Sequence, residues 1–118
     1  MPQTTVNGAS IYYEIRGREG EPVVFIHGSW TDHHQWDVAA DDLAKRFRVL
    51  SFDRRGHSLS PRAAAPGTHI DEDVADAAGL IAQHRFAPAH VVGNSLGAII
   101  ALRLVCQQIG RASCRERV

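Results

Sequence analysis

The chain has 118 residues, with 13 lysines and arginines against 13 aspartates and glutamates, so its formal net charge is zero. This length suits one domain, and the 44% hydrophobic content is typical of a globular protein with a real core. Neutrality argues against a nucleic-acid binder, and no segment has the roughly 18 consecutive apolar residues of a membrane span.

Two features bear on the cellular location. The N-terminal residues have neither the basic nor the apolar region of a signal peptide. Cys106 and Cys114 are too few for a disulfide framework, so we expect a reducing compartment, the cytoplasm. Cys106 lies in an apolar helical segment and is predicted to be a buried, unreactive thiol.

The first half of the chain opens with two β-favouring runs, residues 4–6 and 9–15. Asn7 and Gly8 between them favour the positive φ angles of a tight hairpin turn. The unbroken apolar run at residues 23–26 predicts a strand buried on both faces. A helix should follow, because one apolar stripe contains Trp36, Ala40, Leu43, Ala44 and Phe47.

Strands and helices then alternate. Residues 49–52 and 90–92 are expected as buried strands, and residues 58–67 as a surface loop. A second helix is predicted by the stripe Ile70, Val74, Ala77, Ala78 and Ile81, with Thr68 and Asp71 as its cap and acids suited to the helix dipole. Residues 96–105 should form a third helix that is apolar nearly all round. This order predicts an α/β fold with a mostly parallel sheet flanked by helices.

The sequence Gly-Asn-Ser-Leu-Gly at residues 93–97 lies between a predicted strand and a predicted helix. In that context the G-x-S-x-G spacing places Ser95 on a sharp, strained turn with its hydroxyl exposed. Gly93 and Gly97 are small because the strand and the helix would otherwise collide. The backbone N–H of Leu96 points to where an oxyanion would form. Ser95 is therefore predicted to be a nucleophile, since the phosphate-binding glycine motifs need other spacings.

With two further motifs, the sequence resembles the α/β-hydrolase family from about residue 5 to residue 105. Residues 27–30, His-Gly-Ser-Trp, look like the family's His-Gly loop after its third strand. Residues 53–60, Asp-Arg-Arg-Gly-His-Ser-Leu-Ser, look like its D-x-R-G-H-G-x-S loop after the fourth. The resemblance implies the N-terminal part of an α/β-hydrolase fold, of the branch with a serine nucleophile.

The resemblance also implies roles for individual residues. Ser29 would supply a second oxyanion N–H beside that of Leu96. Loop-shaping roles fall to His27, Gly28, Asp53, Gly56, His57, Gly93 and Gly97. His57 is read as structural rather than as a displaced catalytic base. Ser58 and Ala98 stand where the family usually has glycine, and no cofactor is implied.

The family's catalytic triad needs an acid and a histidine after the nucleophile. All seven histidines of this chain precede Ser95, and Glu116 is the only carboxylate side chain after it. A serine hydroxyl without an imidazole is a poor nucleophile. We therefore expect an N-terminal fragment that is inactive by itself and truncated after the helix at residues 96–105.

The last ten residues break from the apolar helix before them and resemble the in-frame translation of a sequencing adapter. The alternative is a genuine basic helix end, since arginines favour helix C-termini. The resemblance favours a partial α/β-hydrolase domain at residues 1–108 and a non-native tail at residues 109–118.

Two acidic residues, two histidines and two tryptophans allow other interpretations. Asp32, His33, His34 and Asp37 could be a metal cluster, but adjacent histidines on a helix do not share a face, so no metal is predicted. Trp30 is expected in the pocket wall and Trp36 in the core.

The predicted function is that of a serine hydrolase acting on a small ester, thioester, lactone or similar carbonyl substrate through an acyl-enzyme on Ser95. The alternatives are a non-catalytic binding protein or receptor of the same fold, and a cofactor-free haloperoxidase-like or C–C bond hydrolase. The expected partner is a small molecule rather than a nucleic acid or a membrane.

Overall fold

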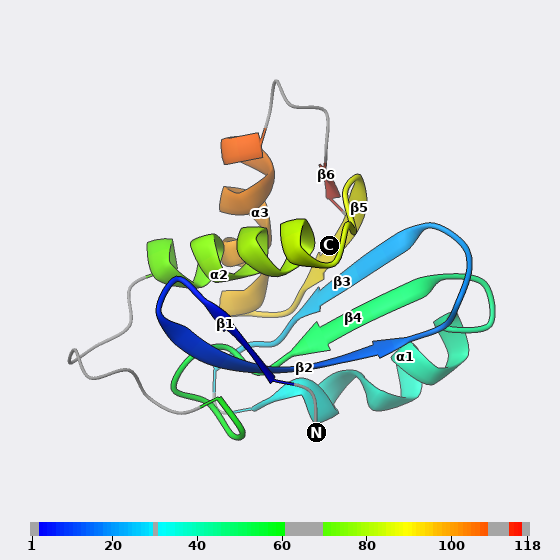
Figure 1. The fold of residues 1–118 in the computed structure, drawn as a ribbon, viewed down its shortest axis with the longest axis horizontal. Coiled ribbons are helices and arrows are strands. Elements are labelled where there is room, and N and C mark those ends of the chain that lie inside the picture. The colour runs from blue at the N-terminus through cyan, green and yellow to red at the C-terminus, as the bar shows by residue number, and fades with distance from the viewer. Residues whose placement is uncertain (1–2, 30, 61–69, 109–113, 117–118) are drawn as a thin grey trace.

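The computed structural model describes residues 3–29, 31–60, 70–108 and 114–116. Its centre is a six-stranded sheet in the order β1-β2-β4-β3-β5-β6 (Figure 1). Strands β3 to β6 run parallel, whereas β2 pairs antiparallel with both β1 and β4. The elements are β1 (Gln3–Val6), β2 (Ala9–Arg16), β3 (Pro22–Ile26), η1 (His33–Trp36), α1 (Asp37–Leu43), β4 (Arg48–Phe52), α2 (Ile70–Gln83), β5 (Ala89–Gly93), α3 (Leu96–Gln108) and β6 (Cys114–Glu116). The predicted α/β fold with an opening hairpin is confirmed.

The hairpin turns at the predicted dipeptide. Asn7 and Gly8 have φ angles of 49° and 79°, the left-handed values that a type I′ turn requires of both central residues. Val6 and Ala9 therefore face each other as the last pair of the β1–β2 ladder.

Successive residues of the central strands alternate between two cores. Val23 and Phe25 face α1, where Trp36 stacks on Phe25 with ring centroids 4.6 Å apart. Val24 and Ile26 face the opposite side and join the larger core formed with α2 and α3. Figure 1 shows α1 apart from the other two helices, which lie together. Both faces of the parallel strands are covered, as their unbroken apolar sequence predicts.

The structure differs from the prediction at the end of α1, at the end of α3, which extends to Gln108, and at the edge of the sheet beside β5. Helix α1 ends at Leu43, yet Phe47 still packs against the same core from the connection to β4. Strand β6 was not predicted, and it pairs with the outer edge of β5, an apolar edge whose backbone groups otherwise lack partners. The predicted cap residue Thr68 and most of the predicted loop lie outside the described residues. The assignment of residues 109–118 as a tail stays a prediction.

Helix α3 buries one face only. Ile100, Ala101 and Leu104 are buried, whereas Ile99 and Leu102 are 46% and 45% exposed. Cys106 is also exposed, so the prediction of a buried thiol is wrong. The physical reason is helical spacing, since position 106 lies seven residues after Ile99 and shares its uncovered face.

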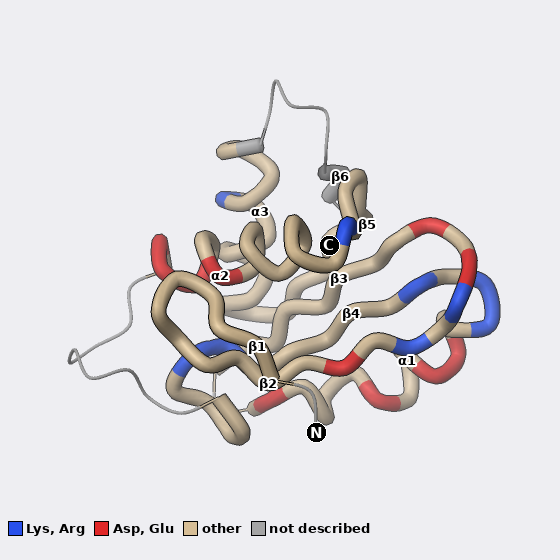
Figure 2. Tube along the Cα trace, in the orientation of Figure 1, with Lys and Arg blue, Asp and Glu red and all other residues tan. Residues whose placement is uncertain are grey.

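None of the helices in the described part of the chain has both the length and the apolar character needed to cross a membrane. Acidic and basic residues are interspersed at the end of the sheet where β3 and β4 begin (Figure 2).

The uncovered face of α3 generates a prediction. We expect the 118-residue chain, expressed alone, to bind the dye ANS and to self-associate, because Ile99 and Leu102 expose apolar surface on one helix face. Replacing both with lysine should reduce dye binding and shift the chain toward monomer in size-exclusion chromatography.

Val38→Lys is the matched control, because Val38 is 85% exposed but lies on α1, away from that face. An unmodified chain that is monomeric and does not bind ANS would contradict the prediction.

Candidate active site

Ser95 stands at the junction of β5 and α3. Its φ angle is 58°, a left-handed value that is uncommon for a residue with a Cβ and that marks backbone strain. The strain persists because both sides of the turn are fixed: the Asn94 N–H donates to the Ile26 carbonyl at 3.3 Å, and the Ala98 N–H donates to the Ser95 carbonyl at 2.9 Å. The residue itself is exposed. The predicted strand-turn-helix context of the G-x-S-x-G sequence is confirmed.

Close backbone packing explains the two glycines of this motif. A Cβ on Gly93 would lie 2.2 Å from the Gly97 carbonyl oxygen, and a Cβ on Gly97 would lie 2.2 Å from the Ile26 carbonyl oxygen. Both distances are far below van der Waals contact. Helix α3 therefore approaches β5 and β3 more closely than any side chain at these two positions would allow.

The His-Gly loop lies directly beside this turn. Strands β3 and β5 are neighbours in the sheet, so the loops after them meet at the same edge. A Cβ on Gly28 would lie 3.0 Å from the Cβ of Ser95 and 2.8 Å from the Asn94 carbonyl oxygen. Ser29 follows as an exposed residue, and Trp30 lies outside the described residues.

His27 joins this loop to the one after β4. Its Nδ1–H donates to the Gly28 carbonyl at 2.7 Å, and its Nε2 accepts from the Arg54 N–H at 3.0 Å. These two bonds require the neutral imidazole. Burial, with a smaller effect from the positive charge of Arg54, lowers the pKa of His27 to about 4.

Asp53 organises the loop after β4. Its carboxylate accepts from the Leu59 N–H at 3.0 Å and from the backbone N–H and the Nδ1 of His33 at 2.8 and 2.7 Å. The backbone carbonyl of Asp53 accepts from the Ser60 hydroxyl at 2.6 Å. The oxygen of that hydroxyl accepts in turn from the Tyr12 N–H at 2.8 Å. The carboxylate thus holds both ends of its loop, which agrees with a loop-shaping role.

His57 and its neighbours occupy the middle of the same loop. The His57 Nδ1 donates to the Arg55 carbonyl at 3.1 Å, and its Nε2 faces an Arg54 Nη2 at 3.5 Å. Gly56 and Ser58 have φ angles of 78° and 43°. Ser58 therefore adopts the left-handed backbone that explains why glycine is usual at this position.

Sequence reasoning missed two buried arginines in this loop. Arg54 pairs with Asp73 at 3.1 Å, and Arg55 pairs with Asp76 at 2.7 Å. Arg55 also contacts Glu72 at 2.7 Å. The acids at the start of α2 therefore bind arginines of the site loop, besides any effect on the helix dipole. The sequence did contain a sign of these pairs, because Asp73 and Asp76 fall among the apolar residues that α2 buries, where a carboxylate needs a positively charged partner.

The structure also brings together three of the four candidate metal ligands. One possible ligand atom from each of Asp32, His33 and His34 lies within 4.8 Å of the others, the one such group found among the described residues. The centroids of the two imidazole rings are 4.0 Å apart, so the expectation that adjacent histidines do not share a face is wrong here, and the absence of a metal stays a prediction. Separate carboxylates orient them, since His33 Nδ1 bonds Asp53 at 2.7 Å and His34 Nδ1 bonds Asp37 at 2.8 Å.

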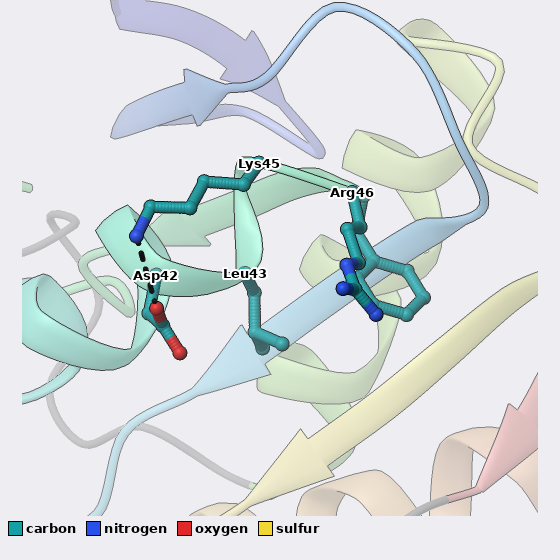
Figure 3. A pocket seen from close by; sticks show the side chains of 5 residues that line it. Asp42, Leu43, Lys45 and Arg46 are labelled. Atoms are coloured by element: carbon teal, nitrogen blue, oxygen red, sulfur yellow. Dashed lines mark hydrogen bonds and ion pairs between the residues drawn. The ribbon is translucent and has the colours of Figure 1, made fainter.

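A separate surface pocket lies at the opposite end of the parallel strands. The side chains that line it come from the end of α1 and the connection to β4 (Figure 3): Asp42, Leu43, Lys45, Arg46 and Phe47. Because β4 begins there and Ser95 follows the end of β5, this pocket has no part in the site around Ser95.

Comparison with known proteins assigns a family to this arrangement. The family model described as "Alpha/beta hydrolase family" matches residues 23–117, which is most of the chain. The chain belongs to the α/β-hydrolase family.

Individual relatives agree with this assignment. The chain is 38% identical over 100 residues to the uncharacterized hydrolase YraK of Bacillus subtilis, covering 84% of this chain and 36% of that protein. It is 36% identical over 103 residues to a non-heme chloroperoxidase of Streptomyces lividans, covering 80% of this chain and 34% of that protein. The crystal structure of the enol-lactonase from Burkholderia xenovorans superposes with a TM-score of 0.85 at 31% identity, covering 93% of this chain and 43% of the enzyme. The chain thus spans about a third of the length of these curated relatives.

The close approach of α3 generates a second prediction. Gly97→Ala should lower the free energy of unfolding by about 1–3 kcal/mol, because the new methyl group must displace the backbone of β3. Chemical denaturation measures the change. Ala98→Ser, one position along the helix, should cost less than about 1 kcal/mol. Equal losses for the two variants would show that the close contact is not what requires glycine.

His27 generates a prediction about pH. The unfolded chain binds a proton on this histidine near pH 6.5, whereas the folded chain resists it until about pH 4, so stability falls as the pH is lowered through this window. This residue alone should account for up to roughly 3 kcal/mol of the loss.

The measurement is the free energy of unfolding of the protein and of His27→Gln at several pH values between 4 and 7. The difference between the two curves isolates His27 from the other titrating groups. The native protein should lose more stability than the variant toward pH 4, and parallel curves would contradict the prediction.

Proposed function

We propose that this chain carries the nucleophile half of a serine hydrolase that acts on a small ester, thioester or lactone. The observation that carries the proposal is the geometry of Ser95: an exposed serine with a left-handed backbone, packed against Gly28 of the neighbouring loop. A strained turn is retained only where the surrounding structure enforces it, and such turns concentrate at functional sites.

In the proposed reaction the Ser95 hydroxyl gives its proton to a base and attacks the acyl carbonyl. The C–O or C–S bond of the substrate breaks, the alcohol or thiol takes up that proton, and water then hydrolyses the acyl-enzyme to the acid and free serine. The backbone N–H groups of Ser29 and Leu96 stabilise the oxyanion, because donors fixed before the reaction cost no reorganisation. Neither His27 nor His57 is suited to act as the base, since both ring nitrogens of each already face other groups. We place the histidine and the acid of the triad after residue 108 of the longer parent protein.

A lactone is the favoured substrate class because the enol-lactonase from Burkholderia xenovorans shares the fold closely at 31% identity. Haloperoxidase activity is the second candidate, favoured by the 36% identity to the Streptomyces lividans chloroperoxidase. A non-catalytic binding protein would have no use for a strained, exposed serine, so the geometry favours the enzyme.

Three further assignments belong to the proposal. The partner is a small-molecule substrate, and the compartment is the cytoplasm, which suits the free thiol of Cys106. Residues 1–108 are the partial hydrolase domain, and residues 109–118 are a non-native tail, on the sequence resemblance described above.

The test is covalent labelling of the full-length parent protein, encoded by the genomic reading frame that contains residues 1–108. A fluorophosphonate probe should modify Ser95, and Ser95→Ala should abolish both labelling and ester or lactone hydrolysis, because the alanine has no nucleophile. The expected loss of turnover is several orders of magnitude. Mass spectrometry of the labelled peptide identifies the modified residue.

Ser10→Ala, in the opening hairpin, is the control and should keep full labelling. The 118-residue chain without a later histidine should show no turnover. Undiminished hydrolysis by the Ser95→Ala protein would refute the nucleophile assignment.

A further inference from the structure

Arg54 is the largest fully buried side chain of the described structure, 2% exposed. Its guanidinium lies behind the His-Gly loop and touches two different elements. The Nε–H donates to the His27 carbonyl at 3.2 Å, and an Nη2–H donates to the Gly28 carbonyl at 3.2 Å. On its other side an Nη1–H donates to the Asp73 carboxylate of α2 at 3.1 Å. One side chain therefore ties the loop beside Ser95 to a helix that follows it in the chain.

The contact with Gly28 has a direct consequence for Ser29. The Gly28 carbonyl and the Ser29 N–H belong to the same peptide unit, which is planar and trans, so they point in opposite directions. Two donors fix that carbonyl, the Nδ1–H of His27 at 2.7 Å and the guanidinium of Arg54. Whatever holds the carbonyl in place also sets the direction of the Ser29 N–H.

We propose that Arg54, anchored by Asp73, is a positioning residue that orients the Gly28–Ser29 peptide so that the Ser29 N–H can stabilise an oxyanion formed at Ser95. This inference rests on the proposed function, because it assigns the Ser29 N–H its catalytic role. The sequence motif does not require an arginine at position 54, since this is the variable position of the D-x-R-G-H-G-x-S pattern.

Asp73 is suited to hold the Arg54 guanidinium in place. It is buried, and its Oδ1 has no hydrogen-bond partner among the described residues, so its main compensating interaction is the one with Arg54. Burial raises the pKa of Asp73, and the positive charge of Arg54 opposes that rise. Lysine could not replace Arg54, because a single ammonium cannot hold two carbonyls and a carboxylate with the fixed geometry of the guanidinium fork.

The adjacent arginine provides a matched control. Arg55 pairs with Asp76 of the same helix at 2.7 Å, and both side chains are buried. Its other contacts are Glu72 and the Asn7 carbonyl, and among the described residues none of its hydrogen bonds reaches the His-Gly loop. Asp73→Asn and Asp76→Asn therefore remove equivalent charges three residues apart, and only the first acts on Arg54.

The experiment compares four variants of the full-length parent protein: Arg54→Lys, Asp73→Asn, Arg55→Lys and Asp76→Asn. Each is assayed for kcat, KM, the rate of fluorophosphonate labelling at Ser95 and the denaturation midpoint. The Arg54 and Asp73 variants should lose about tenfold to a hundredfold in kcat with little change in KM, the size of effect expected when a catalytic donor is misplaced by a fraction of an ångström to an ångström. The Arg55 and Asp76 variants should lose stability to a similar degree but keep kcat within about twofold.

Any of the following results would overturn the positioning role of Arg54. Equal losses of kcat in both pairs, or none in either, overturn the positioning role while leaving the labelling of native Ser95 intact. A native protein that is not labelled at Ser95 overturns the proposed function and this inference together. If Asp73→Asn fails to fold, the double variant Arg54→Met with Asp73→Asn leaves no unpaired buried charge, and retention of full kcat in that protein overturns the proposal.

Discussion

The close contact between the start of α3 and the backbone of β3 and β5 is the constraint on which the rest of the structure depends. With glycine at positions 93 and 97, the helix rests on the carbonyls of its neighbours rather than on side chains. Ser95 is thereby held at the ends of two adjacent parallel strands. Gly28, which is 67 positions earlier in the chain, comes to lie beside it for the same reason.

Much of this arrangement could be predicted from the sequence because its signals are local. The Asn7-Gly8 turn, the apolar strands and the glycines around Ser95 each reflect backbone geometry over a few residues. Burial on the third helix was not predictable in the same way. Whether Cys106 is buried depends on which element packs against its face of α3. The apolar sequence of a helix does not show which of its faces is covered.

The polar contacts of the site were predicted least well, because they join segments that are distant in the chain. The acidic first turn of α2 is fully explained by the general rule for helix dipoles. That explanation gives no reason to expect the specific pairs Arg54–Asp73 and Arg55–Asp76. The adjacent histidines were judged by ideal helix geometry, but Asp53 and Asp37 orient them independently. For both arginines and for His33 a tertiary partner outweighed the local rule, whereas the partner of His34 lies three residues along the chain.

The loop from Asp53 to Ser60 has a fixed span. Its first residue bonds the N–H of Leu59 and the hydroxyl of Ser60, and that hydroxyl accepts from the backbone of β2. Surface loops ordinarily tolerate changes of length at their tips, whereas here an inserted residue would have to break a bond between the two ends. Among natural or engineered versions of this chain, length variation should therefore collect elsewhere, and this segment should keep its eight residues even where their identities change.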